Sequence, residues 1–163
     1  MKIKNLKLII FDVDGVLINS KQNMKLAFKK MCKKNKIQNL IFDNYFKKIG
    51  IPFSKIMMSL GVKNNIERLK KDYFNFSLDL RKKIKPYEGV YKTLKILQKN
   101  YCIAIVTSKS KKNAKNFLNF FFPSINFKVI CSPNKTLKPK PYPHMLLYVC
   151  KKLRIQPSNS IYV

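Results

Sequence analysis

The sequence predicts an α/β fold: a Rossmann-like, doubly wound parallel sheet into which an all-helical block is inserted. Three observations predict it. Short apolar runs alternate with helical periodicity, two aspartates directly follow the first run, and residues 20–84 carry helical patterns only. Strands that alternate with helices form parallel sheets through right-handed crossovers. We therefore expect a core domain of residues 1–19 and 85–163 and an inserted helical cap domain of residues 20–84.

The first predicted strand is LKLIIF at residues 6–11, whose nearly continuous apolar character suits a strand covered on both faces. Gly15 ends this run. Within the inserted block, apolar residues recur at helical spacing in two stretches. These are Met24, Ala27, Phe28 and Met31, and then Ile66, Leu69, Tyr73, Phe76 and Leu80. Turns at IGIPF and SLGV separate the two stretches.

After KPYEGV at residues 85–90, the pattern alternates again. Strands are predicted at 101–106, 127–131 and 160–163. The helices between them show three apolar faces: Val90, Leu94 and Leu97; Ala114, Phe117, Leu118 and Phe121; Leu146, Val149, Cys150 and Leu153.

The composition is strongly basic, with 35 Lys and Arg against 7 Asp and Glu and a net charge of +28. The lysines are spread over almost every segment and no nucleic-acid motif accompanies them, so we interpret them as solvated faces, not as a nucleic-acid surface. No apolar run approaches the roughly 18 residues that cross a bilayer, and the N-terminal run is too short for a secretory leader. We expect a cytoplasmic protein. The four cysteines are widely spaced, which predicts small buried thiols.

In doubly wound sheets, ligands bind outside the carboxyl ends of the strands. The residues predicted at this edge are Asp12, Asp14, Thr107, Ser108, Lys138 and Lys140. A carboxylate can attack phosphorus to form an acyl phosphate, and a second carboxylate two residues along can act as acid and base. A threonine hydroxyl and a lysine can bind phosphoryl oxygens, while Mg²⁺ bridges carboxylate and phosphate. The set therefore predicts phosphoryl transfer at Asp12, assisted by Asp14.

The motifs that contain these residues resemble those of the haloacid dehalogenase superfamily. They are FDVDGVL, VTS and KPKPYP. The resemblance is to its phosphatases with a helical cap after the first motif, of the phosphoglycolate phosphatase and β-phosphoglucomutase type. It implies a Mg²⁺-dependent aspartyl-phosphate mechanism. By this resemblance Asp12 is nucleophile and metal ligand, and Asp14 is acid/base and also a metal ligand. Thr107 and Ser108 bind the substrate phosphate, and Lys140 is the lysine of K-P-x-P.

The family's fourth motif, G-D-x-x-x-D, follows a strand similar to SIYV, and the sequence ends at Val163 before such a motif. We interpret the chain as truncated there and expect weak or no turnover from the 163 residues as written. The expected partner is a small phosphorylated metabolite, with no membrane. A phosphomutase, a non-catalytic remnant and a basic protein that binds phosphorylated ligands or nucleic acid are the alternatives. The helical positions that would select the substrate are Lys21, Asn23, Lys47, Lys48 and the neighbourhood of Pro52.

Overall fold

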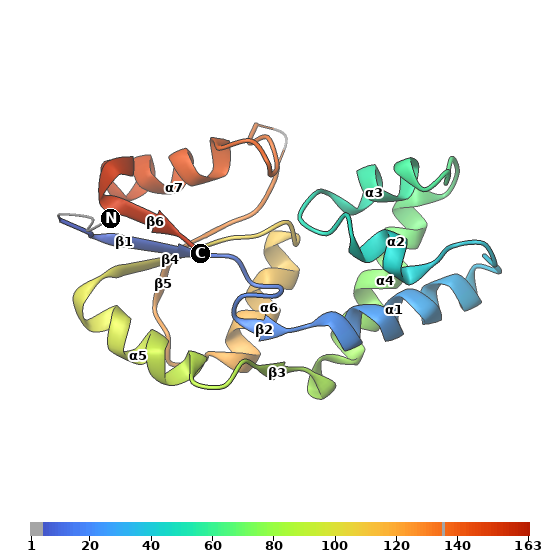
Figure 1. Ribbon diagram of the computed structural model, residues 1–163, viewed down its shortest axis with the longest axis horizontal. Coiled ribbons are helices and arrows are strands. Elements are labelled where there is room, and N and C mark those ends of the chain that lie inside the picture. The colour runs from blue at the N-terminus through green and yellow to red at the C-terminus, as the bar shows by residue number, and fades with distance from the viewer. Residues whose placement is uncertain (1–4, 135) are drawn as a thin grey trace. The chain divides into compact units, whose positions relative to one another are not determined.

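The computed structural model describes residues 5–134 and 136–163. The chain divides into two compact units, one made of residues 1–19 and 85–163 and the other of residues 20–84 (Figure 1). We describe each unit by itself. That residues 20–84 fold as a separate domain stays a prediction.

The first unit is built on a parallel four-stranded sheet in the order β5-β4-β1-β6. Its strands are β1 (Leu8–Phe11), β4 (Cys102–Val106), β5 (Phe127–Cys131) and β6 (Ser160–Tyr162). All four residues of β1 are buried, which explains its unbroken apolar sequence, because a parallel strand is covered on both faces. Phe11 pairs with Ile105, so the residues that follow β1 and β4 lie at the same edge of the sheet. The predicted α/β fold is confirmed.

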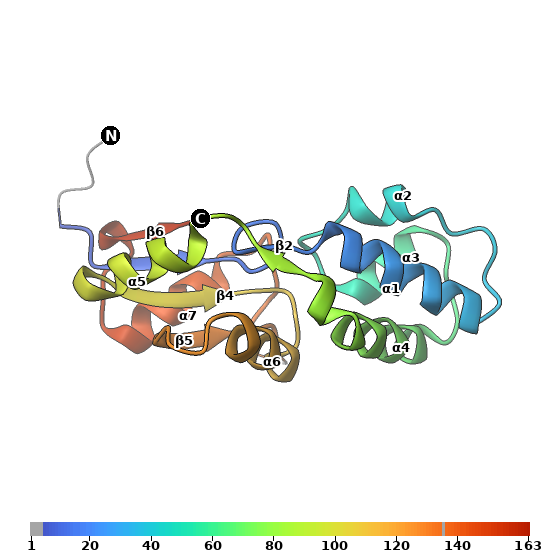
Figure 2. The ribbon, with the colours of Figure 1, turned by 90° about the horizontal axis from the view of Figure 1, so that it is seen from below.

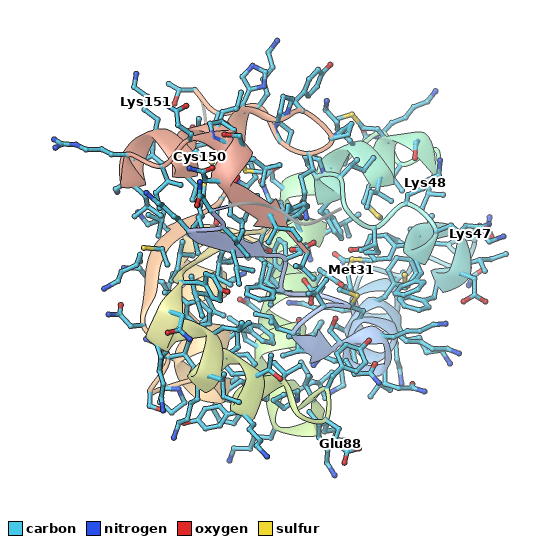
Figure 3. All side chains as sticks on the ribbon, turned by 60° about the vertical axis from the view of Figure 1, so that its left-hand side comes forward. Met31, Lys47, Lys48, Glu88, Cys150 and Lys151 are labelled. Atoms are coloured by element: carbon cyan, nitrogen blue, oxygen red, sulfur yellow. The ribbon has the colours of Figure 1, made fainter. Side chains whose placement is uncertain are left out.

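Three long helices cover this sheet: α5 (Val90–Asn100), α6 (Lys111–Phe121) and α7 (His144–Leu153). Figure 1 shows α5 and α6 on one side of the sheet and α7 on the other. Met145, Val149 and Cys150 of α7 pack on alternate strand residues that include Leu8 and Ala104. Figure 3 shows Cys150 turned inward and its neighbour Lys151 projecting outward, as expected for an amphipathic helix.

The second unit contains α1 (Lys21–Lys34), α2 (Phe42–Phe46), α3 (Phe53–Ser59) and α4 (Ile66–Asp79), followed by a short 3-10 turn (Arg81–Lys83). The predicted stripe of α1 forms its core together with Leu69 and Tyr73 of α4. An aromatic cluster fills the centre, with the rings of Phe53 and Tyr73 stacked at 5.2 Å between centroids. This unit has its own apolar core.

Two short strands were not predicted. β2 (Ile18–Asn19) and β3 (Lys85–Pro86) pair antiparallel where the chain leaves and re-enters the first unit (Figure 2). Two residues are too few to display the alternation by which a strand is recognised in sequence. A second 3-10 turn, Pro157–Asn159, precedes β6. Within residues 5–134 and 136–163, none of the helices combines the length and the apolar character needed to span a membrane.

Candidate active site

A tight loop follows β1 and holds the two carboxylates predicted to be functional. The carbonyl of Val13 accepts hydrogen bonds from the N–H groups of Leu17 and Ile18, at 3.0 and 3.1 Å. Gly15 donates its N–H to the Ile18 carbonyl at 3.0 Å and has a φ of +81°, a conformation that side chains with a Cβ rarely adopt. These bonds fix the turn immediately after Asp14, so its carboxylate is carried by a rigid loop.

Asp12 is held at the sheet edge by both its backbone and its side chain. Its N–H donates to the Val163 carbonyl at 2.9 Å, and its Oδ1 accepts from the N–H of Val13 at 2.7 Å. Its Oδ2 accepts from the ammonium of Lys140 at 2.5 Å, across 128 residues of sequence. Of the two lysines in LKPKPYP, Lys140 is therefore the one that contacts Asp12, while the Lys138 ammonium lies 5.3 Å from the Tyr142 ring.

Tyr162 of β6 completes the surroundings of Lys140. Its Oη accepts a hydrogen bond from the Lys140 ammonium at 3.2 Å. Burial by itself would lower the pKa of Lys140, but the charge of Asp12 and the hydrogen bond to it outweigh burial, so the pKa lies above its usual value. Burial, followed by the charge of Asp12, raises the pKa of Tyr162. At neutral pH, Lys140 is therefore a cation and Tyr162 a neutral phenol.

Asp14 has a lysine partner that the sequence reasoning missed. The Lys109 ammonium lies 2.8 Å from Asp14 Oδ2 and 4.7 Å from the centroid of the Phe117 ring. Lys109 is buried, with 8% of its surface exposed. The other oxygen, Asp14 Oδ1, is buried and has no hydrogen-bond partner among the described residues. A buried oxygen without a partner is unfavourable by about 1–3 kcal/mol, which makes Oδ1 a candidate to meet a ligand or a proton.

Thr107 and Ser108 follow β4, the strand beside β1. Thr107 is buried, its N–H donates to the Cys131 carbonyl at 3.1 Å, and its Oγ1 accepts from the N–H of Lys109 at 3.3 Å. Ser108 is half-buried. The predicted site residues thus lie on loops at one edge of the sheet, with direct side-chain contacts for the pairs Asp12–Lys140 and Asp14–Lys109.

Asp12 and Asp14 are the residues that could hold a metal ion. Within the described part of the chain, no group of three or more His, Cys, Asp or Glu residues gathers at one point. Mg²⁺ does not require such a group, because it binds through one or two carboxylates and takes its other oxygens from water and substrate phosphate. The two aspartates, including the unpartnered Oδ1 of Asp14, therefore fit Mg²⁺.

The positions expected to select a substrate in residues 20–84 differ in exposure. Asn23 is buried, donating its Nδ2 to the Ser77 carbonyl at 3.1 Å and accepting from Ser77 Oγ at 2.8 Å. These bonds tie α1 to α4, so Asn23 serves packing in this structure. The Lys21 ammonium lies 4.8 Å from the centroid of the Phe46 ring. Lys47 and Lys48 directly follow α2, and both are exposed and project outward in Figure 3.

Known proteins share the sequence features and the architecture of this chain. The family model described as haloacid dehalogenase-like hydrolase matches residues 9–163. A Clostridium perfringens protein assigned as pyrophosphatase PpaX is 30% identical, covering 97% of this chain and 74% of that protein. The phosphoglycolate phosphatase of Aquifex aeolicus is 27% identical, and the match covers 97% of this chain and 75% of that protein.

A solved structure of CbbY from Rhodobacter sphaeroides, in complex with phosphate, shares the fold with a TM-score of 0.81 at 16% identity. The structural match covers 96% of this chain and 76% of the CbbY chain. The family match extends over nearly the whole chain, and the curated relatives carry the names of phosphatases. The chain belongs to the haloacid dehalogenase-like hydrolases and is a phosphatase of that family.

Proposed function

We propose that this phosphatase hydrolyses a small phosphomonoester with Asp12 as its nucleophile. One observation carries the proposal: the Lys140 ammonium lies 2.5 Å from Asp12 Oδ2 at the carboxyl end of β1. The lysine and the Val13 N–H fix the orientation of the carboxylate, and the lysine adds a positive charge where a phosphate dianion would arrive.

In the first step, an oxygen of Asp12 forms a bond to phosphorus as the bond from phosphorus to the ester oxygen breaks. The leaving alkoxide takes a proton from Asp14 and departs as an alcohol. In the second step, water attacks phosphorus, the bond between Asp12 and phosphorus breaks, and Asp14 takes the proton of the water. The products are inorganic phosphate and an enzyme in its starting state.

Asp14 is suited to this exchange because its two oxygens have different surroundings. Oδ2 is held by Lys109 at 2.8 Å, which keeps the carboxyl group in one orientation. Oδ1 lacks a partner among the described residues, so it is the oxygen that can carry the proton to and from the reacting oxygen. Lys109 is a positioning residue in this proposal.

In this proposal, Thr107, which follows β4, donates its hydroxyl to a phosphoryl oxygen, and Lys140 binds another. Asp12 and Asp14 would hold Mg²⁺, which when bound neutralises charge on the phosphoryl oxygens. The substrate class is a small phosphorylated metabolite, in keeping with the names of the relatives.

Asp12→Asn tests the proposal, with Asp79→Asn as its matched control. Asp79 is exposed at the last residue of α4, so the same chemical change there leaves the site intact. With p-nitrophenyl phosphate and Mg²⁺, we expect kcat/KM to fall by about 10³-fold or more in Asp12→Asn and to stay unchanged in Asp79→Asn.

A covalent label gives a second readout. Acid-quenched protein incubated with ³²P-labelled acetyl phosphate should carry a label that hydroxylamine removes, as expected for an acyl phosphate, and Asp12→Asn should carry none. Equal turnover, or an equal hydroxylamine-sensitive label, in Asp12→Asn and the parent would overturn the proposal.

A further inference from the structure

A cavity of about 270 Å³ lies along β5, the edge strand of the sheet. Four lysines from three elements line it: Lys111 and Lys115 of α6, Lys128 of β5 and Lys152 of α7. Lys111 and Lys115 are four residues apart, so they project from the same face of α6. Asp12, Asp14, Lys109 and Lys140 are not among the lining residues, so this cavity is separate from the candidate active site.

The four ammonium groups have no carboxylate to neutralise them. Among the described residues, no Asp or Glu lines the cavity. The first unit contains three acidic residues, and two of them, Asp12 and Asp14, are paired with lysines elsewhere. The third, Glu88, is exposed, and Figure 3 shows it projecting outward from the ribbon. All four lysines are exposed, and a bound anion would relieve the repulsion among their charges.

Ser132 supplies an independent sign of a ligand. It directly follows β5, lines the cavity and is 8% exposed, and its Oγ has no hydrogen-bond partner among the described residues. A buried hydroxyl without a partner is unfavourable, and a phosphate oxygen is the kind of acceptor it lacks.

The positive charges of Lys111 and Lys152 both affect the pKa of one buried thiol, that of Cys131. Burial raises the pKa of the Cys131 thiol, and the positive charges of Lys111 and Lys152 oppose that rise. Cys131 is the last residue of β5 and precedes Ser132. Lysines from helices on opposite sides of the sheet therefore act together at the end of β5 where the unpartnered hydroxyl lies.

We propose that this cavity is a binding site for an oligophosphate anion. A small ligand fits better than a nucleic-acid backbone, because the lysines surround one cavity from three elements instead of forming a stripe. The cavity volume lies just below the range of about 300–1,000 Å³ that is usual for small-molecule sites. The anion could be inorganic or the phosphate chain of a nucleotide, and the exposed ring of Tyr148 in the lining offers a surface on which a base could stack.

The test uses the 163-residue chain, calorimetric titration with inorganic tripolyphosphate, and no divalent metal. Ionic strength is physiological, so that charges beyond about 8 Å are screened. The cavity variant is Lys128→Gln/Lys152→Gln. The matched control, Lys92→Gln/Lys99→Gln, removes the same charge from exposed positions of α5. We expect one saturable site, weakened about tenfold or more in the cavity variant and about twofold or less in the control.

Ser132→Ala separates binding from folding. We expect its melting temperature without anion to equal or exceed that of the parent, because an unsatisfied hydroxyl is removed, while its affinity for tripolyphosphate falls. A lower melting temperature with unchanged affinity would contradict a role of Ser132 in binding.

A parallel titration with ATP identifies the source of the oligophosphate. Binding of ATP that is tighter than that of tripolyphosphate and is lost in Tyr148→Ala indicates a nucleotide, and equal binding of the two indicates the inorganic anion. Either outcome of the ATP titration supports an oligophosphate site in this cavity.

Four results would overturn the proposal. The first is no saturable binding of tripolyphosphate. The second is equal weakening in the cavity variant and the control, which would show diffuse attraction to a basic protein. The third is loss of binding in Lys140→Gln but not in the cavity variant, which would place the anion at the active site. The fourth is binding of a single-stranded oligonucleotide, but not of tripolyphosphate, that depends on the cavity lysines.

Discussion

Asp12 and Lys140 should be coupled in the free energy of unfolding, and a double-mutant cycle measures that coupling. The perturbations are Asp12→Asn, Lys140→Gln and the combination of both. The side chains of Lys140 and Asp12 are 17% and 21% exposed, and their charged atoms are 2.5 Å apart. Two unit charges at that distance attract by about 7 kcal/mol at an effective dielectric constant of about 20.

Most of that attraction is offset by the desolvation of both ions, so the expected coupling is about 1–3 kcal/mol. Urea unfolding followed by tyrosine fluorescence near neutral pH gives the four free energies, each from linear extrapolation. The coupling is the amount by which the double variant differs from the sum of the two single variants. A coupling below about 0.5 kcal/mol would refute the inference that this ion pair is formed and desolvated in solution.

The pH dependence of the same cycle has a defined sign. The pKa of Lys140 in the folded protein is raised above the ordinary lysine value. A raised pKa contributes stability that is fully present below the unfolded value of about 10.4 and is lost as pH rises through the folded value. The coupling should therefore stay constant from neutral pH to about pH 10 and decline above it. A decline that begins near neutral pH would contradict this assignment.

Two further predictions address the other ion pairs. Lys109→Gln should lower kcat for p-nitrophenyl phosphate by about 10- to 100-fold with a smaller change in KM, because Asp14 loses its orienting partner. Lys112→Gln, an exposed lysine three residues along, is the control, and equal kcat in both variants would contradict the role of Lys109. In α4, hydrogen bonds from Lys34 and Asn35 lower the pKa of Asp72, so its contribution to stability is present above the unfolded value and lost as pH falls through the folded one. Asp72→Asn should therefore cost about 1–3 kcal/mol in urea unfolding at neutral pH, and the difference from the parent should shrink below about pH 4.

The sequence predicted those helices and strands in which apolar residues recur at a regular spacing along a buried face. The strand predicted at 127–131 is β5 with the same bounds, and the stripe from Met24 to Met31 is buried in α1. The strand predicted at 6–11 begins two residues later, at Leu8. Periodicity locates an element only where several turns or alternations are present. For that reason the two-residue strands β2 and β3 could not be predicted.

For the candidate site, position along the chain was informative where residue type was not. Asp12, Thr107 and Lys140 were predicted because each follows a strand or stands in a recognisable motif, and the structure places all three at one sheet edge. Lys109 also follows a strand, but it stands next to the TS pair and resembles the many solvated lysines. What distinguishes it is burial beside Asp14 and Phe117, a property of tertiary packing that no local pattern encodes.

In a chain with this composition, the acidic residues carry the information about which lysines have a specific role. The described residues form four ion pairs of Lys with Asp or Glu, and three of these acids are Asp12, Asp14 and Asp72, whose side chains are largely buried. The fourth, Glu67, is exposed, and its pair with Lys70 contributes little. A lysine without a carboxylate partner is normally explained by solvent. The four exposed lysines of the cavity along β5 differ from the other solvated lysines because they line one cavity together with a buried, unpartnered hydroxyl. An anion bound in the cavity along β5 would account for both the clustered charge and the unpartnered hydroxyl.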